Sequence, residues 1–379
     1  MSEGYPLPTT WDVDSRDGLR WRTPIPGLGH SSPVVWDDRI YVTTAVGPKE
    51  DASLRTGLYG DIESAADQGR QEWRVLCLDR RTGRVLWSRT AAQGIPKVRR
   101  HMKGTHANPS VATDGRHVVA SFGSEGLYCF DPAGALLWKR DLGVLDAGYY
   151  EVPDAQWGYA SSPVIAGDRV VVQCDIQKDG FVAALDLRTG RDLWRTSRTD
   201  VPTWSSPQVV SGRVVVNGWR HIGAYDLADG RELWRLTGGG DIPVPTPVVS
   251  GDLVYITNAH GMAAPIYAVR WAASGDITPR GSSSTSEGVA WSTYRGGAYM
   301  QTPLVYRDLL YVCRDNGVLG CLDAATGKEV YTQRLGTGRT GFTASPVAGD
   351  GKVYFTGENG EVHVVAAGRR YVPVGGGLL

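Results

Sequence analysis

The stretch LDRRTGRVLW, residues 78–87, decides the fold because it recurs along the chain. Ungapped copies are LDLRTGRDLW (185–194), YDLADGRELW (225–234) and LDAATGKEVY (322–331), and FDPAGALLW (130–138) is one residue shorter. In each copy an apolar strand ends at an aspartate, a turn with a positive-φ glycine follows, and a second strand ends on an aromatic residue. We interpret the aspartates as turn residues, namely Asp79, Asp186, Asp226 and Asp323. We interpret the tryptophans as wedges between neighbouring units, namely Trp87, Trp138, Trp194 and Trp234.

A second repeated element, a short proline-containing segment, precedes each turn unit. Its seven copies are SSPVV (31–35), NPSVA (108–112), SSPVI (161–165), SSPQVV (205–210), PTPVV (245–249), QTPLV (301–305) and ASPVA (344–348). Proline cannot donate to a ladder, so these segments belong on edge strands, such as the innermost strand of a propeller blade. Each unit therefore has an inner strand, a second strand, a third strand ending at Asp and an outer strand ending at Trp. The repeats predict an all-β propeller of four-stranded blades.

The two ends of the chain do not fit a plain sevenfold repeat. LRWRTPI (19–25) resembles an outer strand such as RVLWSRT (84–90), but it precedes the first inner strand. We predict seven complete blades plus a lone N-terminal strand of a truncated eighth blade, with an open gap that exposes strand edges. In domain terms, residues 1–379 form one propeller, with 1–24 as a clasp strand and 25–379 as the blades. Alternatively, the ring tightens to seven blades, and LRWRTPI pairs against the seventh blade and displaces its outer strand, RRYVPV (369–374).

Two long polar segments interrupt the repeat. SGDITPRGSSSTSEG (274–288), in the fifth unit, is rich in Gly and Ser and predicts a flexible loop. Residues 47–71, in the first unit, carry charges of both signs and predict a second long excursion.

Composition limits the possible partners. Lys+Arg and Asp+Glu both number 40, so nothing favours nucleic acid or an anionic membrane. No apolar run is long enough for a transmembrane helix, which argues against membrane insertion. The start, MSEGYPLPTTW, lacks the pattern of a signal peptide. The cysteines, Cys77, Cys129, Cys174, Cys313 and Cys321, form no CxxC, CxxCH or vicinal pair. We interpret Cys77, Cys129 and Cys321, which lie on apolar strands, as small buried residues.

The turn units resemble the pyrrolo-quinoline-quinone-like (PQQ-like) propeller repeat. Over most of its length the chain resembles the BamB-like outer-membrane assembly factor propellers that are abundant in planctomycetes. The segments that carry the resemblance include PGLGHSSPVVW, KVRRHMKGTHANP, FGSEGLYCFD, NGWRHIGAYD, GGGDIPVPTPVV and GGAYMQTPLVYRDLLYVCRDNGVL. The resemblance implies an eight-bladed, usually exported propeller, hence a periplasmic or secreted location, and no known activity. Relatives usually begin with a signal peptide and finish with further inner, second and third strands, and this sequence departs from both patterns.

Candidate functional residues gather on one predicted face. The second-to-third loops and the crossings between blades fall on that face and carry the unusual residues, whereas the turns of the opposite face are mostly short. We predict that the ligand-binding candidates surround the channel mouth on this looped face. They are His101, His106, Asn108, Trp157, Asp175, Trp204, Asn217, Trp219, Arg220, His221, Asn258, His260, Arg314, Asp315 and Asn316. His30 belongs to the same face, and His117 and His363 are interpreted as structural strand residues.

Complete catalytic or metal-binding patterns are not recognisable in the sequence. His101 and His106 are five residues apart in a loop, but zinc needs three or four converging ligands, and no metal site is predicted. Trp157, Trp204 and Trp219 could stack a flat ligand, but a calcium triad, vicinal cysteines and a haem motif are missing. No cofactor is therefore predicted, with PQQ or calcium as the exceptions that the resemblance keeps open. The recurring serines of the SSP segments are interpreted as architectural.

Two functions from different classes remain. The first is a non-catalytic binding or scaffolding propeller whose looped face engages a protein, peptide or glycan. The alternative is an enzyme, either a quinone- or metal-dependent oxidoreductase or a carbohydrate-active enzyme, that uses a polar pocket at the channel mouth. The sequence favours binding because no complete catalytic constellation is recognisable.

Overall fold

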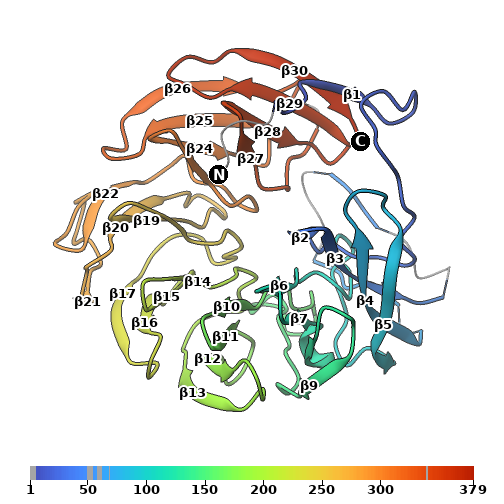
Figure 1. Cartoon of the computed structure of the whole chain (residues 1–379). Helices are drawn as coiled ribbons and strands as arrows, with labels where there is room; N and C mark the ends of the chain where they lie inside the picture. The colour runs from blue at the N-terminus through green and yellow to red at the C-terminus, as the bar shows by residue number, and fades with distance from the viewer. Residues whose placement is uncertain (1–5, 49–53, 58–61, 68, 339) are drawn as a thin grey trace.

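The computed structural model describes residues 6–48, 54–57, 62–67, 69–338 and 340–379, and its regular structure is almost entirely β (Figure 1). The one helical element in these ranges is a short 3₁₀ turn, η2 (Gly123–Glu125). None of the described helices could cross a membrane. The prediction of an all-β propeller is confirmed.

Seven sheets, each with four antiparallel strands, follow one another around a ring (Figure 1). Blade 1 holds β2 (Val34–Trp36), β3 (Arg39–Val46), β4 (Gln71–Asp79) and β5 (Val85–Gly94). Blade 2 holds β6 (Ala112–Thr113), β7 (Val118–Ser121), β8 (Leu127–Phe130) and β9 (Leu136–Arg140). Blade 3 holds β10 (Val164–Ala166), β11 (Arg169–Cys174), β12 (Phe181–Asp186) and β13 (Asp192–Ser197). Blade 4 holds β14 (Gln208–Val210), β15 (Arg213–Val216), β16 (Ile222–Asp226) and β17 (Glu232–Leu236).

The remaining three blades repeat the same order. Blade 5 holds β18 (Val248–Ser250), β19 (Leu253–Thr257), β20 (Ile266–Arg270) and β22 (Val289–Thr293). Blade 6 holds β23 (Leu304–Tyr306), β24 (Leu309–Cys313), β25 (Val318–Asp323) and β26 (Glu329–Arg334). Blade 7 holds β27 (Val347–Gly349), β28 (Lys352–Thr356), β29 (Glu361–Ala366) and β30 (Pro373–Leu378). The proline-marked strands are the inner edges of their sheets, as predicted.

The repeated turn explains the sequence motif. The Asp186 carboxylate accepts hydrogen bonds from the backbone N–H and the hydroxyl of Thr189, and Gly190 has a φ of 70°. A Cβ on Gly190 would also lie 2.6 Å from the ring of Trp138, which belongs to the preceding blade. Glycine is therefore required twice, for its backbone conformation and for the close approach of the indole.

The repeat tryptophans are buried between blades. Indole N–H groups donate to carbonyl oxygens of the next blade, from Trp87 to Pro132 at 2.9 Å, from Trp138 to Leu187 at 2.8 Å and from Trp194 to Leu227 at 2.9 Å. Trp234 is also buried and lies in the apolar cluster between blades 4 and 5. One detail of the prediction is wrong, because each tryptophan lies inside its outer strand and does not end it.

Apolar clusters and a hydroxyl belt join successive blades. Six clusters of buried side chains fill the six interfaces from blades 1 and 2 through blades 6 and 7. Each inner strand is preceded, two residues before its start, by a serine or threonine, namely Ser32, Ser110, Ser162, Ser206, Thr246, Thr302 and Ser345. Backbone N–H groups donate to the hydroxyl of the next blade in the chains 32→110→162→206 and 246→302→345. These hydroxyls are therefore structural, as interpreted from the sequence.

The N-terminal segment differs from the prediction. The strand there is β1 (Thr10–Asp12), which pairs in parallel with β30 as a fifth strand of blade 7. Residues 19–25 form no strand, but Trp21 donates to the Arg80 carbonyl at 3.0 Å and Thr23 to the Gly83 carbonyl at 2.7 Å. Trp21 thus contacts the turn of blade 1 as the outer-strand tryptophans contact the turns that follow them. The alternative in which LRWRTPI pairs with blade 7 is wrong.

Several smaller expectations also need correction. The outer strand of blade 7 is β30, which starts four residues later than RRYVPV. The insertion at 274–288 is not simply a loop, because β21 (Gly275–Asp276) pairs in parallel with β17 and widens blade 4. His117 lies just before β7 and contacts Asp114, whereas His363 is within β29 as expected. The described residues form seven sheets and not the eight that the resemblance implies. All five cysteines are free and buried, and part of the 47–71 excursion lies outside the described residues.

Candidate functional site

The crossings on the looped face gather a continuous set of aromatic side chains. Tyr149 stacks on Trp157 with ring centroids 5.4 Å apart and an interplanar angle of 11°, and Trp157 lies 5.5 Å from Trp204. Tyr149 also meets Tyr150 at 5.3 Å, and Tyr150 lies 5.8 Å from Trp219. We call these five residues the aromatic arc. It extends from the crossing between blades 2 and 3 to the second-to-third loop of blade 4, and all five side chains are half-buried.

Backbone hydrogen bonds hold the indoles of the arc in place. The Trp157 N–H donates to the Ile62 carbonyl at 3.1 Å, and the Trp204 N–H donates to the Gly158 carbonyl at 2.9 Å. The ring of His101 packs edge-on against Trp157 at 5.3 Å. These rings are therefore already ordered before a ligand binds, so binding costs them little further conformational entropy.

Charged groups flank one end of the arc. The Tyr150 hydroxyl donates to Asp241 at 3.0 Å, and Asp241 also contacts the Nδ1 atom of His260. Partial burial, together with the nearby Asp241 and Glu151 carboxylates, raises the pKa of Tyr150 to about 12, so this hydroxyl stays protonated. Burial opposes ionisation of Asp241, but hydrogen bonds from His260 and Tyr150 outweigh it and lower its pKa.

The exposed Arg220 guanidinium covers the same end of the arc. It lies 4.9 Å from the centroid of the Trp219 ring and 5.7 Å from that of Tyr150. His260 in turn stacks on Tyr299 at 5.7 Å. This end of the arc combines a cation, carboxylates and aromatic rings within one surface.

Three of the predicted candidates are buried inside the blades. Asp175 is 1 % exposed and pairs with the fully buried Arg198, whose Nε lies 2.6 Å from the carboxylate. Asn217 donates to the carbonyls of Pro245 and Thr257, and Asn258 donates to that of Gly238. These side chains fix the loops of the looped face and do not reach its surface.

A second buried carboxylate supports the arc directly. Asp200, which was not among the candidates, accepts backbone N–H bonds from Trp219, Arg220 and His221 at 3.0–3.1 Å. His221 turns its Nε2 to Glu232 at 2.6 Å. Burial, followed by the Arg198 charge, lowers the pKa of His221.

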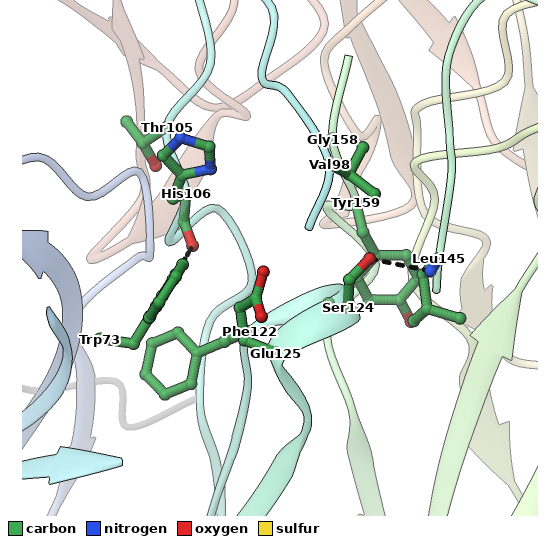
Figure 2. Close-up of a pocket in the computed structure, with 11 residues that line it drawn as sticks. Trp73, Val98, Thr105, His106, Phe122, Ser124, Glu125, Leu145, Gly158 and Tyr159 are labelled. Carbon is green, nitrogen blue, oxygen red and sulfur yellow. Dashed lines mark hydrogen bonds between the residues drawn. The ribbon is translucent and has the colours of Figure 1, made fainter. Parts of the chain in front are cut away.

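His106 belongs to a separate cluster between blades 1 and 2. Its Nε2 lies 3.2 Å from Asp67, which also accepts from the buried Arg100. Figure 2 shows His106, Trp73 and Phe122 on one side of a small pocket and Tyr159, Leu145 and Ser124 on the other. The pocket has a volume of about 30 Å³ and contains Glu125, whose pKa burial raises. That volume suits a water molecule but not an organic substrate. Nearby, the Asn108 side chain accepts from Thr105 and so forms part of its own loop.

The candidates in blade 6 lie apart from the arc. Arg314 lines a cavity of about 150 Å³ with Arg295, Glu329 and Thr332, which belong to blades 5 and 6. Asp315 accepts from the Phe342 N–H through its carbonyl, and Asn316 caps the turn before β25. The structure therefore divides the candidates among the arc, the buried loop supports, the His106 cluster and this cavity.

Sequence reasoning missed Tyr149, Tyr150 and Asp241. The two tyrosines stand in the crossing at 148–160, in which the sequence predicts only Trp157 as a site residue. Asp241 follows the three glycines at 238–240, in the crossing after blade 4. Adjacent aromatic residues in a crossing were the available signal.

Trp157 does not meet the requirements for stacking a flat quinone cofactor. A stacking indole needs a free face, but Trp157 is already stacked on Tyr149 and packed on Trp204. Among the described residues, no group of three or more potential metal-ligating side chains converges.

Comparison with known proteins places the chain in a family. The sequence pattern of the family described as outer membrane protein assembly factor BamB matches residues 71–275 and 280–370. The chain belongs to this BamB family. The BamB crystal structure from Moraxella catarrhalis is similar, with a TM-score of 0.56, 17 % identity and 88 % of each chain covered. No curated protein sequence matches the chain.

Other propellers share the fold with this BamB-family chain. The C-terminal WD40 domain of Sif2 matches with a TM-score of 0.54 at 11 % identity, covering 84 % of this chain and 85 % of that one. The computationally designed Ika8 protein matches with a TM-score of 0.50 at 16 % identity, covering 82 % and 98 %. At these identities the likeness concerns the fold and not the ligand.

Proposed function

We propose that this BamB-family chain is a non-catalytic binding propeller whose looped face engages a protein or peptide through the aromatic arc. Residues 1–379 act as one domain in this proposal, with 1–24 as a clasp and 25–379 as seven blades. The observation that carries the proposal is the continuous contact of five ordered aromatic rings across three blades. Tyrosine and tryptophan beside arginine are the residue types enriched at the energetic centres of protein interfaces.

The family description supports a protein partner and a place in the bacterial envelope. The description of the family as an outer membrane protein assembly factor supports a protein partner in the coarse sense, and it also supports the proposal of a periplasmic location. The arc's shape supports an extended ligand, because a chain lying across it would meet ring after ring. At the Tyr150 end of the arc, Arg220 and the carboxylates of Asp241 and Glu151 would then favour ligands with charged or hydrogen-bonding side chains.

Panning a phage-displayed peptide library against the whole chain tests the proposal. We expect enriched peptides to lose binding to a Tyr150→Ala, Trp219→Ala variant by at least about tenfold, because each interface aromatic typically contributes more than 1 kcal/mol. Leu136→Ala is the matched control, since Leu136 is 52 % exposed on the outer strand of blade 2. Enriched peptides that bind the Tyr150→Ala, Trp219→Ala variant as tightly as the Leu136→Ala control would show that the peptide-binding surface lies outside the aromatic arc.

A glycan is the second candidate ligand. Aromatic rings flanked by carboxylates and an arginine can stack sugar faces and bond their hydroxyl groups, and Tyr150, Asp241 and Glu151 supply such a set. A glycan array probed with the same two variants separates the cases: saccharide binding that requires the arc, together with no enriched peptide, would favour a glycan.

An enzyme remains the alternative from another class. The observation in its favour is the contact between Asp241 and His260, in which a carboxylate orients an imidazole near the surface. No nucleophile contacts His260 among the described residues, so binding is the better proposal. A panel of substrates tests the alternative. If the chain turns over one of them and the His260→Gln variant does not, an enzymatic function becomes the better proposal.

A further inference from the structure

One position on the third strand of each blade points toward the preceding blade and differs in size around the ring. In blade 6 it is Gly320, which pairs with Thr332. In blades 2 and 5 it is Tyr128 and Tyr267, which pack against the clusters shared with blades 1 and 4. The other residues in this register are Leu76, Ala183, Gly223 and His363, in blades 1, 3, 4 and 7. Glycine therefore occurs at this position in blades 4 and 6.

In blade 4 the space over this glycine is filled. A Cβ added to Gly223 would lie 3.3 Å from the Tyr225 ring and 3.5 Å from Nε2 of His221. The buried Arg198, which follows the outer strand of blade 3, donates to the Tyr225 hydroxyl at 2.8 Å, and its charge is neutralised by Asp175 at 2.6 Å. The interface between blades 3 and 4 therefore contains both a buried cation and the carboxylate that balances it.

In blade 6 the space over the glycine is open. Leu322 and Val318 stand in the register of Tyr225 and His221, and neither reaches as far. The nearest atom to a Cβ added to Gly320 would be Cδ1 of Leu322, at 3.8 Å. The smaller residues leave a cavity of about 150 Å³ between blades 5 and 6, which we call the 5–6 cavity.

Two arginines line the end of the 5–6 cavity that is nearer the looped face. Arg314 follows β24, and its backbone is held in a turn in which its N–H donates to the Val318 carbonyl at 3.0 Å. Arg295 follows β22 and is exposed, so the cavity opens to solvent on this side. A Cβ added to Gly296 would lie 3.5 Å from Nη2 of Arg314. The two segments that carry the arginines therefore meet at the cavity.

The chain supplies no anion to these two arginines within the described residues. The Nε atom of Arg314 is buried without a hydrogen-bond partner, and no described carboxylate lies within 4.0 Å of the Arg314 or Arg295 guanidinium. Counted from the first residues of β11 and β19, Ala259 occupies the position of Asp175. Because a buried N–H of a charged group is costly without an acceptor, the missing carboxylate indicates that the acceptor comes from outside the chain.

The one carboxylate among the described lining residues belongs to Glu329, which lies at the other end of the 5–6 cavity. Glu329 pairs with Leu322, whereas the turn of Arg314 closes on Val318, four residues earlier on β25. Four strand residues span roughly 13 Å, a distance at which exposed charges are largely screened. Asp315, although next to Arg314 in sequence, does not line the cavity. The arginine end of the cavity is therefore positively charged.

We propose that the 5–6 cavity binds a carboxylate group, which supplies the negative charge that Asp175 supplies between blades 3 and 4. The planar guanidinium of Arg314 offers adjacent N–H groups that match the two oxygens of a carboxylate, and Arg295 adds a second positive charge at the opening. Ile266 and Leu322 give the cavity apolar walls, so a carboxylate on a short aliphatic chain fits better than an inorganic ion. The site is distinct from the aromatic arc and does not depend on the proposed function.

A ligand-observed NMR titration of the whole chain with propionate tests the proposal. We expect saturable binding at low ionic strength, and we expect Arg314→Gln to weaken it at least about tenfold, because a hydrogen bond to a charged group contributes at least that factor. Arg188→Gln, at an exposed arginine in the turn of blade 3, is the matched control and should leave the affinity unchanged. Propionate that binds Arg314→Gln as tightly as the wild type would overturn the proposal.

A second variant fills the 5–6 cavity and leaves both arginines in place. Gly320→Leu gives blade 6 the residue type that blade 1 carries at this position, Leu76, and the added side chain enters open space. We expect this variant to melt at or above the wild-type temperature, because filling a cavity with an apolar side chain is stabilising, and to lose propionate binding. Undiminished binding to folded Gly320→Leu would show that propionate binds elsewhere, which would overturn the proposal.

Titrations with two further probes identify the ligand class and its source. Inorganic phosphate that binds at least about tenfold more tightly than propionate would overturn the assignment to a carboxylate. Acetyl-glutamate amide presents the same group as an acidic side chain of a partner protein. Tighter binding of this probe than of propionate would support the proposal with a partner's side chain as the source, and equal or weaker binding would support it with a free short-chain acid as the source. No saturable binding of either carboxylate would overturn the proposal.

Discussion

A single contact between a tryptophan and a glycine turn joins each of several blades to the next. The indole covers the positive-φ glycine and donates to a carbonyl of the same turn, as Trp194 does with Gly230 and Leu227. The contact combines burial of a large ring with a satisfied N–H group, which an aliphatic residue could not provide. The recurrence of Trp and Gly at fixed spacing follows from this geometry.

Truncating one of these rings should destabilise the chain strongly. We expect Trp194→Ala to lower the free energy of unfolding by about 3–5 kcal/mol, because the ring is only 8 % exposed and leaves a cavity. Urea denaturation measures the change, with the exposed Leu136→Ala as a control within about 0.5 kcal/mol of the wild type. An unchanged midpoint for Trp194→Ala would contradict its role in blade packing.

The lowered pKa of His221 predicts a pH dependence. Its imidazole is held neutral by burial and by Arg198, so the unfolded chain takes up this proton at a higher pH than the folded chain does. The contribution of His221 to stability is therefore complete above the unfolded pKa of about 6.5 and is lost as pH falls from there toward the folded pKa. An NMR titration should give a midpoint below 6.5, and a midpoint at or above that value would disprove the shift.

At the scale of elements, buried carboxylates fix the positions of loops on the looped face. Asp200 gathers three successive backbone N–H groups of the loop that carries Trp219, and Asp175 neutralises the buried Arg198 beside it. Buried side chains that lie beneath the surface of the looped face therefore hold its loops in place.

Removing the Asp200 carboxylate should loosen the end of the aromatic arc. In Asp200→Ala three N–H groups lose their acceptor, so we expect faster hydrogen exchange at residues 219–221 and weaker binding of any arc ligand. Asp200 also lies 3.5 Å from the buried Arg198 guanidinium, and loss of this buried ion pair predicts a destabilisation of about 3–5 kcal/mol. Asp168→Ala, at an exposed aspartate of blade 3, serves as the control. Unchanged exchange at residues 219–221 would contradict this role.

At the scale of the whole molecule, the N-terminal segment links the two ends of the ring. Leu7 donates its N–H to Asp350, Tyr354 donates to the Pro8 carbonyl, and β1 covers the edge of β30. These contacts join residues more than 300 positions apart in sequence. They close a long loop and cover an outer strand that would otherwise be exposed.

Deleting residues 2–12 should therefore both destabilise the chain and favour its association. The melting temperature is expected to fall, and light scattering should show aggregates because the edge of β30 becomes free. Restoring the segment as a separate peptide should reverse the aggregation in part. A truncated chain that melts at the wild-type temperature and stays monomeric would show that the segment is not a clasp.

The sequence by itself determined the blades. Turn aspartates, positive-φ glycines, inner-strand prolines and buried tryptophans act within a few residues or between adjacent repeats, so their spacing could be recognised along the chain. The same logic identified the recurring serines as architectural, although not the belt that they form. For the candidate site, the sequence indicated the crossings but not which side chains face outward: Trp157 and Trp219 join the arc, whereas Asn217 and Asn258 are fully buried.

Only the tertiary structure decided how the ends of the ring and the loops come together. Residues 19–25 have the composition of an outer strand, but no strand stands beside them to pair with, so they retain the tryptophan contact without the ladder. Thr10–Asp12 gives no strand signal in sequence, yet it pairs with β30, where Gly375 and Gly377 leave room for Thr9 and Trp11. Such contacts depend on the separation of blades 7 and 1, which is the sum of all the intervening blade packings and is not encoded in any local stretch of the chain.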